Sequence, residues 1–99
     1  MKHESILKAI LKLNGQLESK QNGDTFNGSL CTGLWTFTLN ERVLQWHSYT
    51  DGKACHLWAY TESSKSAWEA DPHSAYRDDY YGWYPETIKS LIKWLEGNP

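Results

Sequence analysis

The chain lacks long hydrophobic runs and an excess of either charge. Its apolar runs are only a few residues long, and Lys8 and Lys12 interrupt the N-terminal apolar pattern, so we expect neither a signal peptide nor a membrane span. With 10 Lys and Arg against 12 Asp and Glu, the formal charge is −2, which provides no basic field for a nucleic-acid backbone. These absences predict a cytoplasmic protein that binds neither a membrane nor nucleic acid.

Cysteine and β-branched aliphatic residues are also scarce. Cys31 and Cys55 have no Cys-x-x-Cys spacing, which predicts two free thiols in a reducing compartment. One Val and four Ile stand against six Trp and six Tyr, so aromatic rings must fill much of the core. A chain of 99 residues is long enough for one hydrophobic unit, and we expect a single domain over residues 1–99.

Two amphipathic patterns predict helices near the two ends of the sequence. Apolar residues at helical spacing predict the first helix over about residues 3–14, before Gly15. The segment "YPETIKSLIKWLEG" predicts the second, with Pro85 in the first turn and Gly97 as the stop. A short polar helix is expected near "SSKSAWEA", ending before Pro72.

Between the helices the apolar period changes to two, which is typical of strands. Residues 33–39, "GLWTFTL", alternate in this way, and a strand is expected on each side of Asp51-Gly52, a dipeptide favoured in two-residue hairpin turns. Upstream, Asn22-Gly23 predicts a turn, and the surrounding segment is expected to add one or two weaker strands.

A two-residue loop at Asp51-Gly52 fixes the register of the hairpin and places His47 directly opposite His56. Alternation then separates two sides. The apolar face holds Leu44, Trp46, Cys55, Leu57 and Ala59. The second face holds Val43, Gln45, His47, Tyr49, His56, Trp58 and Tyr60.

A short connection through Asn40 and Glu41 would put Trp35, Phe37 and Leu39 on the apolar face as well. Two amphipathic helices need such a surface to bury their apolar stripes. The predicted fold is therefore α+β, an antiparallel meander of three to five strands with the N-terminal and C-terminal helices packed on one face. The second face is left to water, a ligand or a partner.

Three chemical interpretations of the second face compete. Opposed histidines could give a metal two ligands, but the face supplies no third ligand, and the loop offers only His73 or Asp71. A pair of histidines could act as general acid and base, but no nearby Lys or Arg would hold a phosphate. A cross-strand pair that contributes packing and hydrogen bonds is favoured, so no catalytic residue, metal or cofactor is predicted. Cys55, expected on the apolar face, is predicted to be a small hydrophobe.

Residues 68–86, "WEADPHSAYRDDYYGWYPE", combine acidic and aromatic side chains. Five carboxylates against Arg77 give this segment a net charge of −4. Tyr and Trp provide large contact areas, and acidic neighbours steer a basic partner. The competing interpretation is that the rings anchor the loop to the sheet while the carboxylates keep it soluble. The predicted binding residues of the segment are Tyr76, Asp78, Asp79, Tyr80, Tyr81 and Trp83.

The order helix, three strands, helix resembles that of the double-stranded RNA-binding domain, but only in topology. The second helix begins "PETIKSL" and has no basic cluster at its start, so phosphate binding is not implied. We expect an interaction protein, of inhibitor or immunity type for example, that binds a basic protein partner through the acidic aromatic segment and the second face. A homodimer through that face, and a small-ligand or carbohydrate-binding module or minor enzyme using its His, Trp and Tyr residues, are the alternatives.

Overall fold

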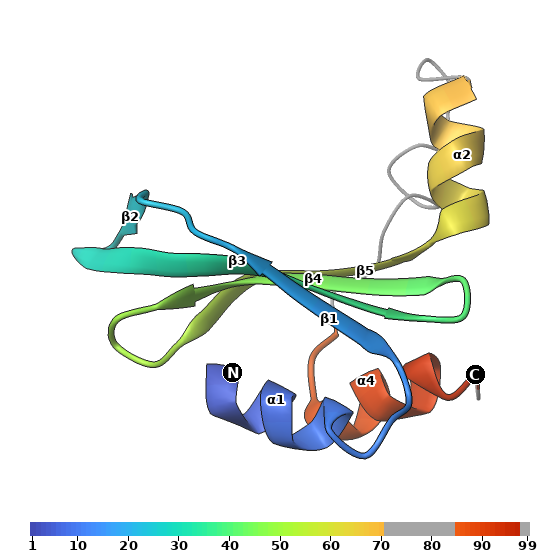
Figure 1. Cartoon of the computed structure of the whole chain (residues 1–99), viewed down its shortest axis with the longest axis horizontal. Coiled ribbons are helices and arrows are strands. Elements are labelled where there is room, and N and C mark those ends of the chain that lie inside the picture. Colours follow the sequence, from blue (N-terminus) through green and yellow to red (C-terminus); the bar gives the residue numbers. More distant parts are fainter. Residues whose placement is uncertain (71–84, 98–99) are drawn as a thin grey trace.

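The computed structural model describes residues 1–70 and 85–97, without the side chains of residues 67 and 68. These residues form an α+β domain with an antiparallel sheet, as predicted (Figure 1). The elements are α1 (His3–Ile10), β1 (Gln16–Lys20), β2 (Thr25–Phe26), β3 (Ser29–Leu39), β4 (Arg42–Tyr49), β5 (Ala54–Thr61), α2 (Glu62–Ala70) and α4 (Ile88–Leu95). The sheet order is β1-β3-β4-β5, and β2 pairs with the beginning of β3. None of the helices in the described ranges is long and apolar enough to cross a membrane.

Helices α1 and α4 lie on the same side of the sheet (Figure 1), as the apolar patterns predicted. Helix α1 is shorter than expected because the chain turns at Leu13, whose N–H donates to the carbonyl of Ile10 at 2.9 Å. Helix α4 begins later than expected, because Thr87 and Ser90 form a capping box at its N-terminus. The predicted polar helix is α2, which extends from the end of β5 on the side of the sheet away from α1 and α4 (Figure 1).

The core lies between the apolar face and the two helices. Trp46 and Leu44 of β4 are fully buried, and Trp35 stacks on Trp46 with ring centroids 6.2 Å apart. Strands β3 and β4 are joined by the predicted short connection, in which Asn40 has φ of 57°. The buried members of the core are Ile6, Ile10, Phe37, Leu44, Trp46, Ala54, Ala59, Leu91 and Leu95.

The turn between β4 and β5 is one residue longer than predicted. The N–H of Tyr49 donates to the carbonyl of Lys53 at 3.1 Å, so the loop contains residues 50–52. Only Gly52 takes a positive φ, 85°, whereas Asp51 accepts a hydrogen bond from the N–H of Lys53 at 2.9 Å. A three-residue loop of this kind ends in one left-handed residue, a position that glycine occupies without strain.

The longer loop changes the register near the turn. His47 lies opposite Cys55, so the predicted His47–His56 pairing is wrong, and Cys55 lies on the second face instead of the apolar face. A β-bulge at His56, whose φ is 54°, then absorbs the extra residue. Beyond the bulge the predicted pairs are confirmed: Gln45 with Trp58, Leu44 with Ala59 and Val43 with Tyr60.

Upstream of β3, two additional strands are present where the sequence predicted one or two. The tight hairpin turn between β2 and β3 is at Asn27-Gly28, where φ is 50° and 83°. The predicted turn at Asn22-Gly23 lies in the connection between β1 and β2, where the side chain of Asn22 accepts a hydrogen bond from the N–H of Asp24 at 3.0 Å. The hairpin of β2 and β3 carries Phe26 over the end of the sheet.

Candidate binding site on the second face of the sheet

Two β-bulges turn both cysteines toward the second face at one end of the sheet. In β3 the register shifts between Cys31 and Gly33, so that Cys31 lies opposite Tyr49. In β5 the bulge at His56 places Cys55 opposite His47. Without either extra residue, alternation would direct each cysteine to the apolar face. Bulges occur often beside functional sites, where they redirect a side chain.

The predicted residues of the second face differ in exposure. Tyr49 and Tyr60 are buried, with 6% and 7% of their surfaces exposed, whereas His47 and Trp58 are partly buried. Only His56 is exposed. The predicted residues between 76 and 83 lie outside the described part of the chain.

Four rings pack together at the turn end of the second face, and we call them the ring cluster: Phe26, His47, Tyr49 and His56. The rings of His47 and His56 meet edge to face at 5.4 Å between centroids, so these side chains are neighbours even though their backbones are not paired. Phe26 packs on His56 at 5.1 Å and on Tyr49 at 5.8 Å. The hydroxyl of Tyr49 lies 3.5 Å from Nδ1 of His56. With 41% of its surface exposed, Phe26 forms the outer surface of the ring cluster.

A thiol lies against the ring cluster. Sγ of Cys31 is 3.5 Å from Nδ1 of His47, a hydrogen-bonding distance for sulfur, and 3.6 Å from the carbonyl oxygen of Gly33. The backbone N–H of Cys31 donates to the carbonyl of Asp24, which ties this part of β3 to the connection before β2. The Cys31 side chain is buried, with 2% of its surface exposed.

The surroundings of the cluster shift two pKa values. Burial lowers the pKa of His47, the charge of His56 lowers it further, and the carboxylate of Asp24 opposes both. Burial raises the pKa of the Tyr49 phenol, and Cys31, Cys55 and Asp24 add to this effect. These shifts favour the neutral imidazole of His47 and the protonated phenol of Tyr49 at neutral pH.

This set of side chains has the donor types that zinc or copper would take, but its geometry differs from that of a metal centre. Within residues 1–70 and 85–97, no group of three or more His, Cys, Asp or Glu side chains is arranged to hold a metal ion. The chemistry available from these residues is hydrogen bonding, proton exchange between a thiol and an imidazole, and ring contact.

The other end of the second face contacts α2. The rings of Trp58 and Tyr60 meet at 6.2 Å, and the ammonium of Lys65 lies 5.6 Å from the centre of the Tyr60 ring. Lys65 is also 4.0 Å from a carboxylate oxygen of Glu69. A shallow depression of about 240 Å³ lies here, lined by Val43, Tyr60 and the first turns of α2.

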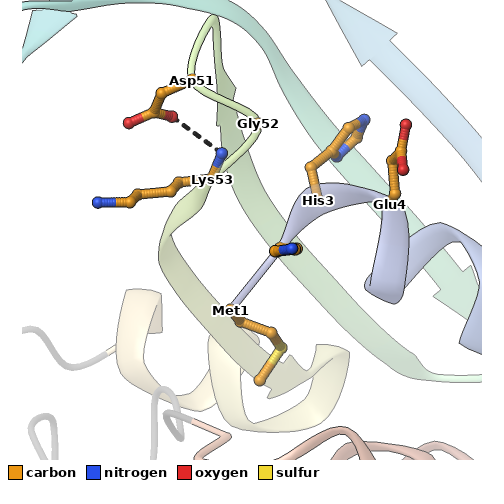
Figure 2. Close-up of a pocket in the computed structure, with 7 residues that line it drawn as sticks. Met1, His3, Glu4, Asp51, Gly52 and Lys53 are labelled. Carbon is orange, nitrogen blue, oxygen red and sulfur yellow. Dashed lines mark hydrogen bonds between the residues drawn. The ribbon is translucent and has the colours of Figure 1, made fainter.

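A larger depression, of about 560 Å³, lies between the hairpin turn and the start of α1 (Figure 2). Figure 2 shows Asp51 and Lys53 of the hairpin turn on one side and His3 and Glu4 of α1 on the other. It forms where residue 2 pairs with residue 53, with the N–H of His3 donating to the carbonyl of Gly52 at 3.1 Å. These contacts join α1 to the sheet, and the depression results from that attachment.

Sequence reasoning missed Phe26 and Cys31 as members of the site. A signal for Phe26 existed, because Asn27-Gly28 directly after it is a hairpin dipeptide of the same kind as Asn22-Gly23. For Cys31 the available signal was Gly33, because an isolated glycine in a strand often marks a bulge.

Comparison with protein-family models, curated proteins and solved structures finds no significant match to this chain.

Proposed function

We propose that the chain is a protein-interaction domain that binds a basic protein partner through its second face and the acidic aromatic segment 68–86. The observation that carries the proposal is Phe26, a large ring that is 41% exposed yet held at its base by His56 and Tyr49. Rings that are already ordered in the free protein bury a large area on binding at little cost in side-chain entropy. An inhibitor or immunity-type role is consistent with such a contact.

The exposed rings of Phe26 and His56 support a protein partner over a small ligand. Among the described residues, the depressions of about 560 and 450 Å³ lie outside the ring cluster, and the depression of about 240 Å³ is lined by Val43 and Tyr60 of the second face together with α2. Small-ligand sites are concave, whereas protein contacts use broad and flatter surfaces.

The charge of the proposed surface favours a basic partner. The segment 68–86 has a net charge of −4 in the sequence. In α2, which lies beside the second face, Glu62 and Glu69 are exposed, and the one cation, Lys65, is held near Tyr60 and Glu69. A surface of one sign raises the association rate with a partner of the opposite sign.

The proposal is tested by recovering partners from a native lysate with the intact chain and with Phe26→Ala. The matched control is Leu11→Ala, because Leu11 is an apolar side chain that is 84% exposed at the end of α1, away from the second face. Phe26→Ala should weaken binding of the recovered partner about tenfold or more, and Leu11→Ala should leave it unchanged. Equal binding by both variants, with urea unfolding midpoints like that of the unaltered chain, would contradict the proposal.

The acidic and aromatic residues of the segment should act on different rate constants. Asp78→Asn with Asp79→Asn should slow association and reduce its salt dependence, because charges act mainly before contact. Trp83→Ala should mainly speed dissociation. If Trp83→Ala instead lowers the thermal unfolding temperature and leaves dissociation unchanged, the segment anchors the fold. Sedimentation decides whether a second copy of the chain is the partner, and a monomer at high concentration removes the homodimer.

A further inference from the structure

The pair of Cys31 and His47 has a chemical capability that partner binding does not use. The thiol and the imidazole are on neighbouring strands, with Sγ and Nδ1 at 3.5 Å, and the bulge in β3 is what directs the thiol toward the ring. A thiol reacts as its thiolate, so a base within proton-transfer distance controls its reactivity. Cys31 therefore has a base, the imidazole of His47, within hydrogen-bonding distance of its thiol.

His47 is suited to accept the thiol proton. Its lowered pKa keeps the ring neutral near pH 7, and a neutral imidazole has one nitrogen free to accept. The carboxylate of Asp24 acts on His47 in the opposite direction and so favours the imidazolium once the proton has moved. The raised pKa of Tyr49 keeps the neighbouring phenol neutral, so no phenolate competes for the proton.

A cavity of about 450 Å³ adjoins Cys31 on the side of the β1–β2 connection. Its wall is formed by Gln21, Asn22, Gly23, Leu30, Cys31 and Thr32. The volume is within the range of small-molecule sites, and the lining has polar side chains and backbone but no charged side chain. At Gly23, one of the lining residues, no atom lies within 4 Å of the position that a Cβ would take.

We propose that Cys31 is a thiol–disulfide exchange site for low-molecular-weight disulfides, with His47 as the proton acceptor. Sγ of Cys31 attacks one sulfur of R–S–S–R, so that a Cys31–S–S–R bond forms as the S–S bond of the reagent breaks. The thiol proton moves to Nδ1 of His47, and the electron pair of the broken bond leaves with R–S⁻. The imidazolium then returns the proton to give R–SH. Cys31 is oxidised and the small disulfide is reduced, so no other oxidant is needed.

The test uses 4,4′-dithiodipyridine, a neutral disulfide whose released thiopyridone is measured by absorbance. A Cys55→Ser chain presents Cys31 alone, and a Cys31→Ser chain presents Cys55 alone. His47→Gln, in the Cys55→Ser chain, removes the proton acceptor. Leu11→Ala, in the Cys55→Ser chain, is the control, because Leu11 is 84% exposed at the end of α1 (Figure 1), on the opposite side of the sheet from the thiol and His47.

The dependence of the rate on pH separates an assisted thiol from an ordinary one. An unassisted thiol with a pKa of about 8.5 loses about fiftyfold in rate between pH 8.5 and pH 6.5, because its thiolate fraction falls by that factor. Cys31 should lose less than about tenfold over this interval. His47→Gln should restore the steep dependence and lower the rate at pH 6.5 by about tenfold, whereas Leu11→Ala should leave the rate within about twofold.

Several results would overturn the proposal. Cys31 reacting only at the rate of global unfolding in urea would show that the thiol is inaccessible in the folded chain. A fiftyfold pH dependence with His47 present, or unchanged rates in a folded His47→Gln chain, would show that the imidazole gives no assistance. Circular dichroism and urea midpoints establish whether His47→Gln folds. If it does not fold, the pH dependence measured in the chain that retains His47 shows whether the imidazole assists the thiol. Mass spectrometry should find one adduct, on Cys31.

Discussion

The contact between Trp46 and His3 predicts that the stability of the fold depends on pH. Nε1 of Trp46 donates to Nδ1 of His3 at 2.9 Å, and the Trp46 side chain is fully buried. The imidazole also packs on Trp35 at 4.8 Å between centroids. Only a neutral His3 can accept this hydrogen bond, because both ring nitrogens of a protonated imidazole are donors.

The direction of the effect follows from the pKa of His3. Burial lowers this pKa from its ordinary value of 6.5, and the charge of Glu4 opposes the shift in part. The unfolded chain therefore binds a proton at higher pH than the folded chain does. The stabilisation is complete above pH 6.5, and the free energy of unfolding falls as the pH decreases through the folded pKa.

The magnitude is set by the indole N–H that loses its acceptor. A buried donor without a partner costs about 1 to 3 kcal/mol, so His3→Ala should lower the free energy of unfolding at pH 7.5 by about that amount. For a domain of this size, each kcal/mol corresponds to about 4 to 8 °C in Tm. His3→Gln should lose less, because an amide oxygen can accept from the indole and does not titrate.

Urea unfolding at pH 7.5 and at pH 5, followed by tryptophan fluorescence, measures both effects. The loss between the two pH values should be smaller in His3→Gln than in the unaltered chain. His47, whose pKa is also lowered, contributes in the same direction in both proteins, and the difference between them isolates His3. Equal losses in the two proteins, or His3→Ala as stable as the unaltered chain, would refute the reasoning.

Two further predictions concern packing. Trp46→Ala should cost about 3 to 5 kcal/mol as a truncation in the core, and His47→Ala much less, so equal losses in urea unfolding would contradict the assignment of faces. Gly15→Ala should destabilise by about 1 to 3 kcal/mol, because a Cβ would lie 2.4 Å from the Phe37 ring, whereas Gly23→Ala, which meets no atom within 4 Å, should be nearly neutral in thermal unfolding.

The helices and the apolar face could be predicted because several independent patterns agree on them. Phe37, Leu44 and Ala59 come from three strands, and each is buried where alternation placed it. An error of one residue in any of these strands would expose its apolar side chains, so the helices covering the face hold the register. The ends of α1 and α4 were less predictable, because capping by Thr87 and the turn at Leu13 depend on a few local contacts.

The hairpin register could not be decided in the same way, because both registers satisfy the apolar pattern. With a two-residue loop Cys55 would lie opposite Ser48, whereas with the observed three-residue loop Ala54 lies opposite Ser48. Both are small and apolar, so the core accepts either. Asp51-Gly52 suits both loops as well, since a three-residue loop also needs one left-handed position, which Gly52 occupies.

The choice between the two hairpin registers leaves the core unaffected, but it changes which side chains lie on the second face. In the predicted register His47 and His56 would lie directly opposite each other on the second face, and Cys55 would lie in the core. In the observed register Cys55 faces His47, and the positive φ of the bulge at His56 still brings the two imidazole rings to 5.4 Å. The histidine contact was thus predicted correctly from an incorrect backbone pairing. The bulge in β3 independently brings Cys31 beside His47, so two separate bulges together place both thiols near the imidazole rings.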